Sequence, residues 1–165
     1  MPDFPPLIMG VDVGAGGGLA FLDSRLTVRG CFDVPPFVQA YKMPETRADL
    51  LELIEPFLAY NVIRRAVVEK VHSSPQMGVA SAFTFGMNYE RVLMALTCLK
   101  IPFVEVTPGT WQKAFMLKKG KGLGLSPTEK KNDHKRVAQE LFPSLKVTLA
   151  ICDALLIAEF ARRQQ

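Results

Sequence analysis

The stretch Leu7–Asp23, LIMGVDVGAGGGLAFLD, decides the expected fold. Its apolar run with one carboxylate, Asp12, near the end predicts a buried strand, and the glycine-rich turn before LAFLD predicts a second strand folding back on it. An ionised Asp is costly inside an apolar strand unless a cation meets it, and glycines let another group approach the backbone closely. The stretch therefore indicates either a metal or phosphate site, or a tight hairpin whose Asp12 caps the turn.

The length and composition predict a single domain spanning residues 1–165. A chain of this length with 48% hydrophobic residues can bury a sizeable core. It contains no apolar segment long enough to span a bilayer, so we expect no membrane association. The start, MPDFPPLIMG, has neither the pattern of a secretion signal nor that of an Arg-rich transit peptide, which favours a cytoplasmic location. The separated Cys31, Cys98 and Cys152 are typical of small core residues in a reducing compartment.

The rest of the chain alternates strands and helices. Loose alternation over Leu26–Val34 predicts a third antiparallel strand, followed by a proline-rich connector, and VIRRAVVEK and IPFVEV predict two more strands. Helical spacing follows the connector, where Pro56 predicts a kink or an early end, and recurs in segments that include Asp133–Phe142 and Val147–Arg162. This order predicts a mixed sheet with helices on its faces.

Three carboxylates occur in apolar surroundings, where a charge is costly. Asp12 lies in the first strand, Glu69 ends the valine-rich VIRRAVVEK strand, and Asp153 lies in the apolar segment CDALLIAEF. They would be favourable together if they converged on shared cations, and carboxylate oxygens suit Mg²⁺ or Mn²⁺. Such a cluster beside basic residues is typical of two-metal phosphoryl-transfer sites. The alternative is three acids with separate partners.

The positive charge is concentrated in one window of the sequence. Residues Lys113–Arg136 carry a net charge of +6, whereas the whole chain carries +4, so the remainder sums to −2. A local positive patch on a slightly acidic body indicates binding to a polyanion, and a solvated Lys-rich loop is the alternative. The lysines concerned are Lys113, Lys118, Lys119, Lys121, Lys130, Lys131 and Lys135.

Several motifs, in order, resemble RuvC-type Holliday junction resolvases. They are Asp12-x-Gly14, EKVHSSPQMGVASAFTFG from Glu69, VTPGTWQKAF, the KK–D–LFP helix and DALLIAEF. The His-Ser loop and the SAF-x-FG segment after Glu69 are most similar to the phage and chloroplast branch. The resemblance covers nearly the whole chain and implies an α/β, ribonuclease H-like fold with a mixed five-stranded sheet and helices on both faces. It also implies a homodimer that nicks four-way DNA junctions symmetrically with Mg²⁺, or with Mn²⁺ as a substitute, in a bacterial or phage-infected cell.

The resemblance implies roles for individual residues. Asp12, Glu69 and Asp153 match the family's metal carboxylates, and Lys130 or Lys131 matches the basic residue near the scissile phosphate. The expected contacts to the junction lie in the loop after Glu69, at the start of the following helix and among the lysines: His72, Ser73, Met77, Gly78, Ser81, Phe83, Phe85, Lys113, Lys118, Lys119, Lys121 and Lys135. The alternative for Phe83 and Phe85 is a position in the core, and the alternative for His72 is a loop position without a function.

The last motif departs from the family pattern. RuvC relatives usually carry another acid or a His three to five positions before the final Asp, where this chain has Thr148, Leu149 and Ala150. Either the second ion is held by Asp12, Asp153, water and DNA alone, or Asp133 approaches from the preceding helix, or the protein binds junctions more than it cuts them. We expect an active enzyme.

Other functions are compatible with parts of the pattern. An Asp-x-Gly hairpin also opens actin-like and sugar-kinase ATPases, but those need two such domains and this chain has room for one. A ribonuclease H-like nuclease on RNA or on another branched DNA would use the same acids. Two symmetric nicks require two copies of the site, and the long helix carrying Val92, Leu93 and Leu96 is the expected dimer interface, with core packing as the alternative.

Overall fold

The computed structural model describes residues 6–14, 16–25, 37–60, 62–72, 76–117 and 126–164. In this part of the chain, five strands form one sheet in the order β3-β2-β1-β4-β5. The strands are β1 (Leu7–Asp12), β2 (Gly18–Asp23), β3 (Val38–Lys42), β4 (Ile63–Glu69) and β5 (Phe103–Val106). The first three pair antiparallel, whereas β4 and β5 run parallel to β1, so the sheet is mixed as predicted.

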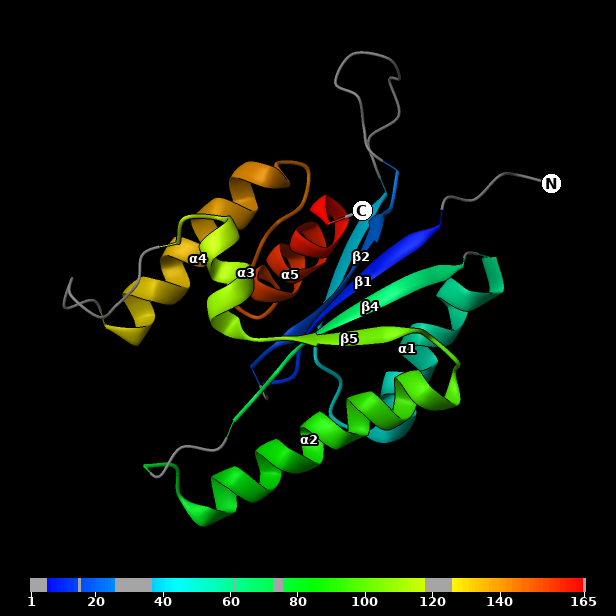
Figure 1. Cartoon of the computed structure of the whole chain (residues 1–165), viewed down its shortest axis with the longest axis horizontal. Coiled ribbons are helices and arrows are strands. Elements are labelled where there is room, and N and C mark those ends of the chain that lie inside the picture. The colour runs from blue at the N-terminus through cyan, green and yellow to red at the C-terminus, as the bar shows by residue number, and fades with distance from the viewer. Residues whose placement is uncertain are drawn as a thin grey trace.

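Helices cover both faces of this sheet (Figure 1). They are α1 (Arg47–Tyr60), α2 (Val79–Cys98), α3 (Pro108–Ala114), α4 (Pro127–Leu141) and α5 (Cys152–Arg163). Alternate side chains of a strand point to opposite faces, and the core is divided accordingly. Leu7, Met9 and Val11 of β1 pack in the cluster formed with α1 and α2, whereas Ile8 packs in the cluster formed with α3, α4 and α5. The central strand is therefore buried on both sides.

Several predicted boundaries differ from the structure. The third strand, β3, lies in the segment expected to be a connector, where pairing with β2 forms it, while Leu26–Val34 lies outside the described residues. Helix α1 continues through Pro56 to Tyr60 and does not end early. Helix α5 begins at Cys152 and not at Val147, although Val147 and Ile151 are already buried in the cluster on this face of the sheet.

Local sequence signals explain where α4 begins. Ser126 caps the helix: its side-chain oxygen accepts the backbone N–H of Glu129, and the Glu129 carboxylate accepts the backbone N–H of Ser126 at 2.8 Å. Pro127 takes the first helical position, where its missing N–H costs nothing. The helix therefore starts six residues before the predicted Asp133, and this longer helix carries Lys130 and Lys131.

Helix α2 corrects the expected dimer interface. Val92 and Leu96 are fully buried in the core cluster under the sheet, and Leu93 packs against it, so these residues face inward. The exposed apolar side chains of α2 are Val79, Phe83, Met87 and Met94. The first thirteen residues of the helix bury no side chain fully, and in Figure 1 this N-terminal part projects beyond the other elements.

Two further expectations concern burial. Cys152 is buried as predicted, but Cys98 is exposed at the end of α2, and Cys31 lies outside the described residues. None of the described helices is both long and apolar enough to cross a membrane.

Candidate active site

Two of the three predicted carboxylates end neighbouring parallel strands. Asp12 is the last residue of β1 and Glu69 is the last residue of β4. Asp12 is in phase with Ile8, and Glu69 with Val67, and both of these apolar residues pack in the cluster on the α5 side. Because Val11 pairs with Val68 in the parallel register, the two carboxylates emerge side by side at one edge of the sheet, on the face that α5 covers.

The glycine-rich turn after β1 fixes the Asp12 carboxylate. The backbone N–H of Gly14 donates to Asp12 Oδ1 at 3.1 Å, so this carboxylate does cap its turn. A Cβ atom on Gly17 would lie 2.3 Å from the Asp12 carbonyl oxygen and 2.7 Å from its Cγ, so only glycine fits there. The capping interpretation of this turn is therefore confirmed at Asp12, whereas the metal or phosphate site stays a prediction.

The third carboxylate comes from α5. A Cβ atom on Gly10 would lie 2.3 Å from the carbonyl oxygen of Ala154 and 2.8 Å from the Cβ of Ala158. The missing side chain at Gly10 and the small side chains of α5 let this helix lie directly on β1. Asp153, in the first turn of α5 and only 7% exposed, is thereby placed against Asp12.

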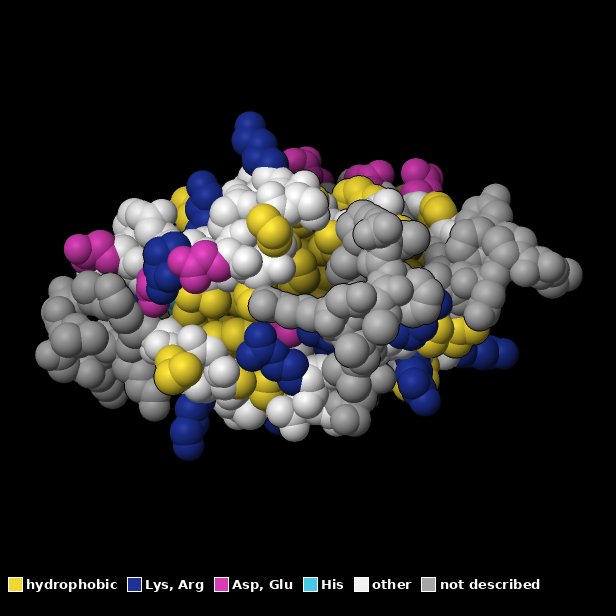
Figure 2. Space-filling view, turned by 90° about the horizontal axis from the view of Figure 1, so that it is seen from above, with side chains coloured by type: hydrophobic (Ala, Val, Ile, Leu, Met, Phe, Trp, Pro, Cys, Tyr) yellow, Lys and Arg dark blue, Asp and Glu magenta, His cyan; other side chains and the backbone are white. Residues whose placement is uncertain are grey.

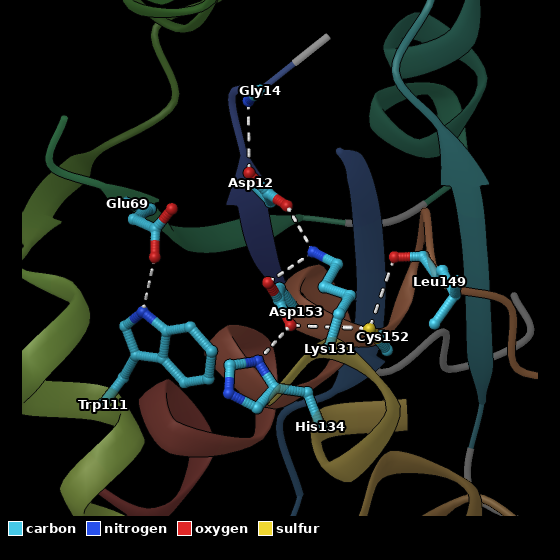
Figure 3. Close-up of polar contacts among 9 residues, drawn as sticks. All are labelled: Asp12, Gly14, Glu69, Trp111, Lys131, His134, Leu149, Cys152 and Asp153. Atoms are coloured by element: carbon cyan, nitrogen blue, oxygen red, sulfur yellow. Dashed lines mark hydrogen bonds and ion pairs between the residues drawn. The ribbon is translucent and has the colours of Figure 1, made fainter. Parts of the chain in front are cut away.

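Lys131 of α4 joins two of these acids. Its Nζ lies 2.5 Å from Asp153 Oδ2 and 3.5 Å from Asp12 Oδ2 (Figure 3). Sequence reasoning left Lys130 and Lys131 equivalent, and the structure places the ammonium of Lys131 between the carboxylates. The two carboxylates are buried, whereas the Lys131 side chain is 30% exposed, so the ammonium compensates charges that have lost most of their water.

Burial and the charges of neighbouring groups shift the pKa values of the three acids. Burial raises the pKa of Asp12, although Lys131 opposes this, and burial together with the nearby Asp12 charge raises the pKa of Glu69 to about 7. Burial also acts on Asp153, but the hydrogen bond with His134 and the Lys131 ammonium outweigh it, so the pKa of Asp153 is lowered. The two aspartates differ first because His134 bonds to Asp153 only, and then because Lys131 lies closer to Asp153. A site with such perturbed carboxyl groups is typical of function.

Two residues that sequence reasoning did not assign to the site contact its acids. The Trp111 indole Nε1–H donates to Glu69 Oε1 at 2.9 Å, and His134 Nδ1 lies 2.8 Å from Asp153 Oδ1. Trp111 is fully buried, as expected of a packing anchor, but it also has this polar role. The signal for His134 was its spacing, three residues after Lys131 and four before the buried Ala138, which puts all three on one helix face.

The acids fit a divalent cation chemically but do not surround one as they stand. Within the described ranges, no three His, Cys, Asp or Glu side chains are gathered closely enough to hold a metal ion. The Lys131 ammonium is nevertheless a cation held by Asp12 and Asp153, and carboxylate oxygens are the ligands that Mg²⁺ prefers. Asp12, Glu69 and Asp153 are therefore the residues that could hold such an ion after Lys131 moves.

Neither the segment before Asp153 nor Asp133 of α4 supplies the further metal ligand that the family pattern has before its last Asp. Thr148 and Leu149 are exposed and Ala150 is half-buried ahead of α5. Asp133, which we considered as a replacement, is buried and pairs with Arg136 of its own helix at 2.9 Å. The α4 side chain that reaches Asp153 is His134.

The predicted junction contacts near α2 are mostly accessible. Phe83 is 69% exposed, so it is not a core residue, while Phe85 is half-buried. His72, Gly78 and Ser81 are exposed and Met77 is half-buried, whereas Ser73 lies outside the described residues. The exposed Phe83 offers a large apolar surface close to the start of α2.

The predicted basic patch is only partly described. Lys113 is exposed, and Lys130 and Lys135 are half-buried, whereas Lys118, Lys119 and Lys121 lie outside the described residues. Arg136 pairs with Asp133 and Glu140 and so contributes little free positive charge. On the face drawn in Figure 2, Lys and Arg side chains are scattered among acidic ones and form no single patch among the residues coloured there.

Solved structures share this architecture. Thermus thermophilus RuvC in complex with a Holliday junction substrate superposes with a TM-score of 0.60 at 18% sequence identity, covering 96% of each chain. A second structure of Thermus thermophilus RuvC gives a TM-score of 0.56 at 19% identity, again with 96% of each chain covered. The fold is that of RuvC. The α/β, ribonuclease H-like fold predicted from the sequence is thereby confirmed.

The likeness to RuvC lies in the fold and not in overall sequence. No protein-family model matches the chain, and no curated protein sequence matches it. At identities of 18% and 19%, the RuvC structures show how the helices and strands are arranged. The roles of individual residues are argued from the geometry of the site.

Proposed function

We propose that this protein is a structure-selective endonuclease that resolves four-way DNA junctions by paired symmetric nicks. The proposal is supported by a RuvC-like fold in which Asp12 and Glu69 end neighbouring strands and Asp153 of α5 shares the Lys131 ammonium with Asp12. The fold neighbour with a Holliday junction substrate supports a branched DNA ligand. The His-Ser loop after Glu69 supports membership of the phage and chloroplast branch.

The chemistry requires cations at these carboxylates. Two Mg²⁺ ions, or Mn²⁺ in their place, would supply an activated water and stabilise the leaving oxygen of the phosphodiester. Asp12 is near enough to Glu69 and Asp153 for their charges to interact, and the three acids together would hold the ions. The Lys131 ammonium, which lies beside Asp12 and Asp153, would stabilise the charge developing on a scissile phosphate bound next to it.

Paired nicks require a twofold assembly. A single copy of the site cuts one strand, so resolution into two ligatable duplexes calls for a homodimer with two sites related by symmetry. The exposed apolar face of α2, formed by Val79, Phe83, Met87 and Met94, is the surface we assign to the second copy and to the junction crossover. Large apolar side chains on one helix face are costly in water unless a partner covers them.

The decisive experiment compares the parent with Asp12→Asn on a labelled four-way junction in Mg²⁺. We expect the parent to nick opposing strands symmetrically, and the variant to lose cutting by at least 100-fold while its junction affinity in EDTA stays equal or rises, because a phosphate-repelling charge is gone. A linear duplex and an RNA–DNA hybrid serve as competing substrates. Junction binding by the parent without any cutting would favour a junction-binding protein, and a preference for the hybrid would favour a ribonuclease.

A further inference from the structure

Each carboxylate of the site has one oxygen fixed by a protein donor. Asp12 Oδ1 accepts the Gly14 N–H, Glu69 Oε1 accepts the Trp111 indole N–H, and Asp153 Oδ1 faces His134 Nδ1. The second oxygen of each aspartate faces the Lys131 ammonium. Among the described residues, the second oxygen of Glu69 has no hydrogen bond or ion pair. Three acids from three elements thus share one arrangement, in which one oxygen is anchored and the other is left for a cation.

The donors for Glu69 and Asp153 contact each other. The Trp111 and His134 rings lie edge to face, with centroids 5.5 Å apart and an angle of 76° between their planes. Trp111 is fully buried and His134 is 8% exposed, so neither ring has much room to turn. In Figure 3 the two side chains lie side by side below the acids, Trp111 under Glu69 and His134 under Asp153.

The hydrogen bond identifies His134 as a donor. A carboxylate oxygen only accepts hydrogen bonds, so in the ionised form of Asp153 that binds a cation the shared proton belongs to His134 Nδ1. The same carboxylate oxygen is also approached by the Cys152 Sγ at 3.4 Å. Burial raises the pKa of this thiol to about 12, so it too is a neutral donor.

We propose that Trp111 and His134 are positioning residues for divalent-cation binding: each anchors one oxygen of Glu69 or Asp153 and so directs the other oxygen of that acid to a cation. This inference rests on the proposed function, and it gives Trp111 of α3 and His134 of α4 a part in it. Donors behind metal-binding side chains fix the ligand orientation, and their loss typically lowers metal affinity about 10- to 100-fold.

The test uses the full chain without DNA and titrates Mn²⁺ by calorimetry. Trp111→Phe removes the indole N–H and keeps an aromatic ring, and His134→Phe does the same for the imidazole. His134→Asn retains an amide donor near the position of Nδ1. The matched control is Leu117→Ala, which removes a buried side chain from the same apolar cluster without touching the acids. Thermal melts check that each variant folds.

We expect both phenylalanine variants to bind Mn²⁺ at least 10-fold more weakly than the parent. His134→Asn should recover most of the loss, and Leu117→Ala should bind like the parent. In junction cleavage, the half-saturating Mg²⁺ concentration should rise by a similar factor, while the rate at saturating Mg²⁺ and the junction affinity in EDTA change little. If Trp111 and His134 had a purely structural role, all variants would lose stability, and the phenylalanine variants would not differ from Leu117→Ala and His134→Asn in Mn²⁺ affinity.

Three outcomes would overturn the inference: parental Mn²⁺ affinity in both phenylalanine variants, an equal loss in His134→Asn and His134→Phe, or no Mn²⁺ binding by the parent. Failure of the proposed function would give a different set of results from failure of this inference. In that case the parent binds Mn²⁺, Asp12→Asn abolishes this binding, and no junction is cut. The Mn²⁺ affinities of the Trp111 and His134 variants still decide the positioning role under that outcome.

Discussion

Replacing Glu69 by Gln should stabilise the metal-free protein at alkaline pH while it abolishes cleavage. Burial and the nearby Asp12 charge raise the pKa of Glu69 from its ordinary 4.5 to about 7. The folded carboxyl group therefore keeps its proton between about pH 4.5 and 7, where the unfolded chain has lost it, so stability falls as the pH rises through this window. At about 1.4 kcal/mol for each pH unit, the loss amounts to up to about 3 kcal/mol.

Glutamine carries no charge and retains an oxygen for the Trp111 N–H, so the variant should escape this loss. Urea unfolding in EDTA should give equal free energies of unfolding for parent and variant near pH 4, and a variant more stable by about 2–3 kcal/mol at pH 8. Adding Mg²⁺ at pH 8 should stabilise the parent more than the variant, because ligands stabilise the state that binds them.

The matched control is Glu105→Gln, an exposed carboxylate on the neighbouring strand β5. Its free energy of unfolding should follow that of the parent within about 0.5 kcal/mol at both pH values. If Glu69→Gln also follows the parent at pH 8, then burial does not disfavour the Glu69 charge, and the electrostatic description of the site is wrong.

Three further predictions test other parts of the molecule. Gly10→Val should lower the free energy of unfolding in urea by roughly 3 kcal/mol, because its Cβ would overlap the backbone of α5, and normal stability would contradict the close packing. Met87→Asp with Met94→Asp should convert a dimer to a monomer in analytical ultracentrifugation, and an unchanged dimer would place the interface elsewhere. Replacing Lys118, Lys119 and Lys121 together by alanine should weaken binding to every DNA shape. It should also reduce the slope of log affinity against log salt by about one for each phosphate that is no longer neutralised, and an unchanged slope would exclude contact by these lysines.

Much of the sheet could be predicted because its signals are local. The apolar run ending at Asp12, the glycines after it and the valine-rich run ending at Glu69 each specify a strand and its end. The failed predictions concern faces and boundaries. Val92 and Leu96 were expected at a dimer interface because helical spacing identifies an apolar face without telling whether the sheet or a partner covers it. Residues Val38–Lys42 were expected in a connector, and pairing with β2 makes them a strand.

By itself, the sequence determined which chemical groups are available: three carboxylates at costly positions, a lysine pair and glycines where only a missing side chain allows close approach. The tertiary structure decided how these groups meet. It selected Lys131 over Lys130, and it brought Trp111 to Glu69 and His134 to Asp153. The physical reason is that a hydrogen bond between residues 42 positions apart, such as Trp111 with Glu69, depends on how α3 packs on the sheet, and no local pattern encodes that packing.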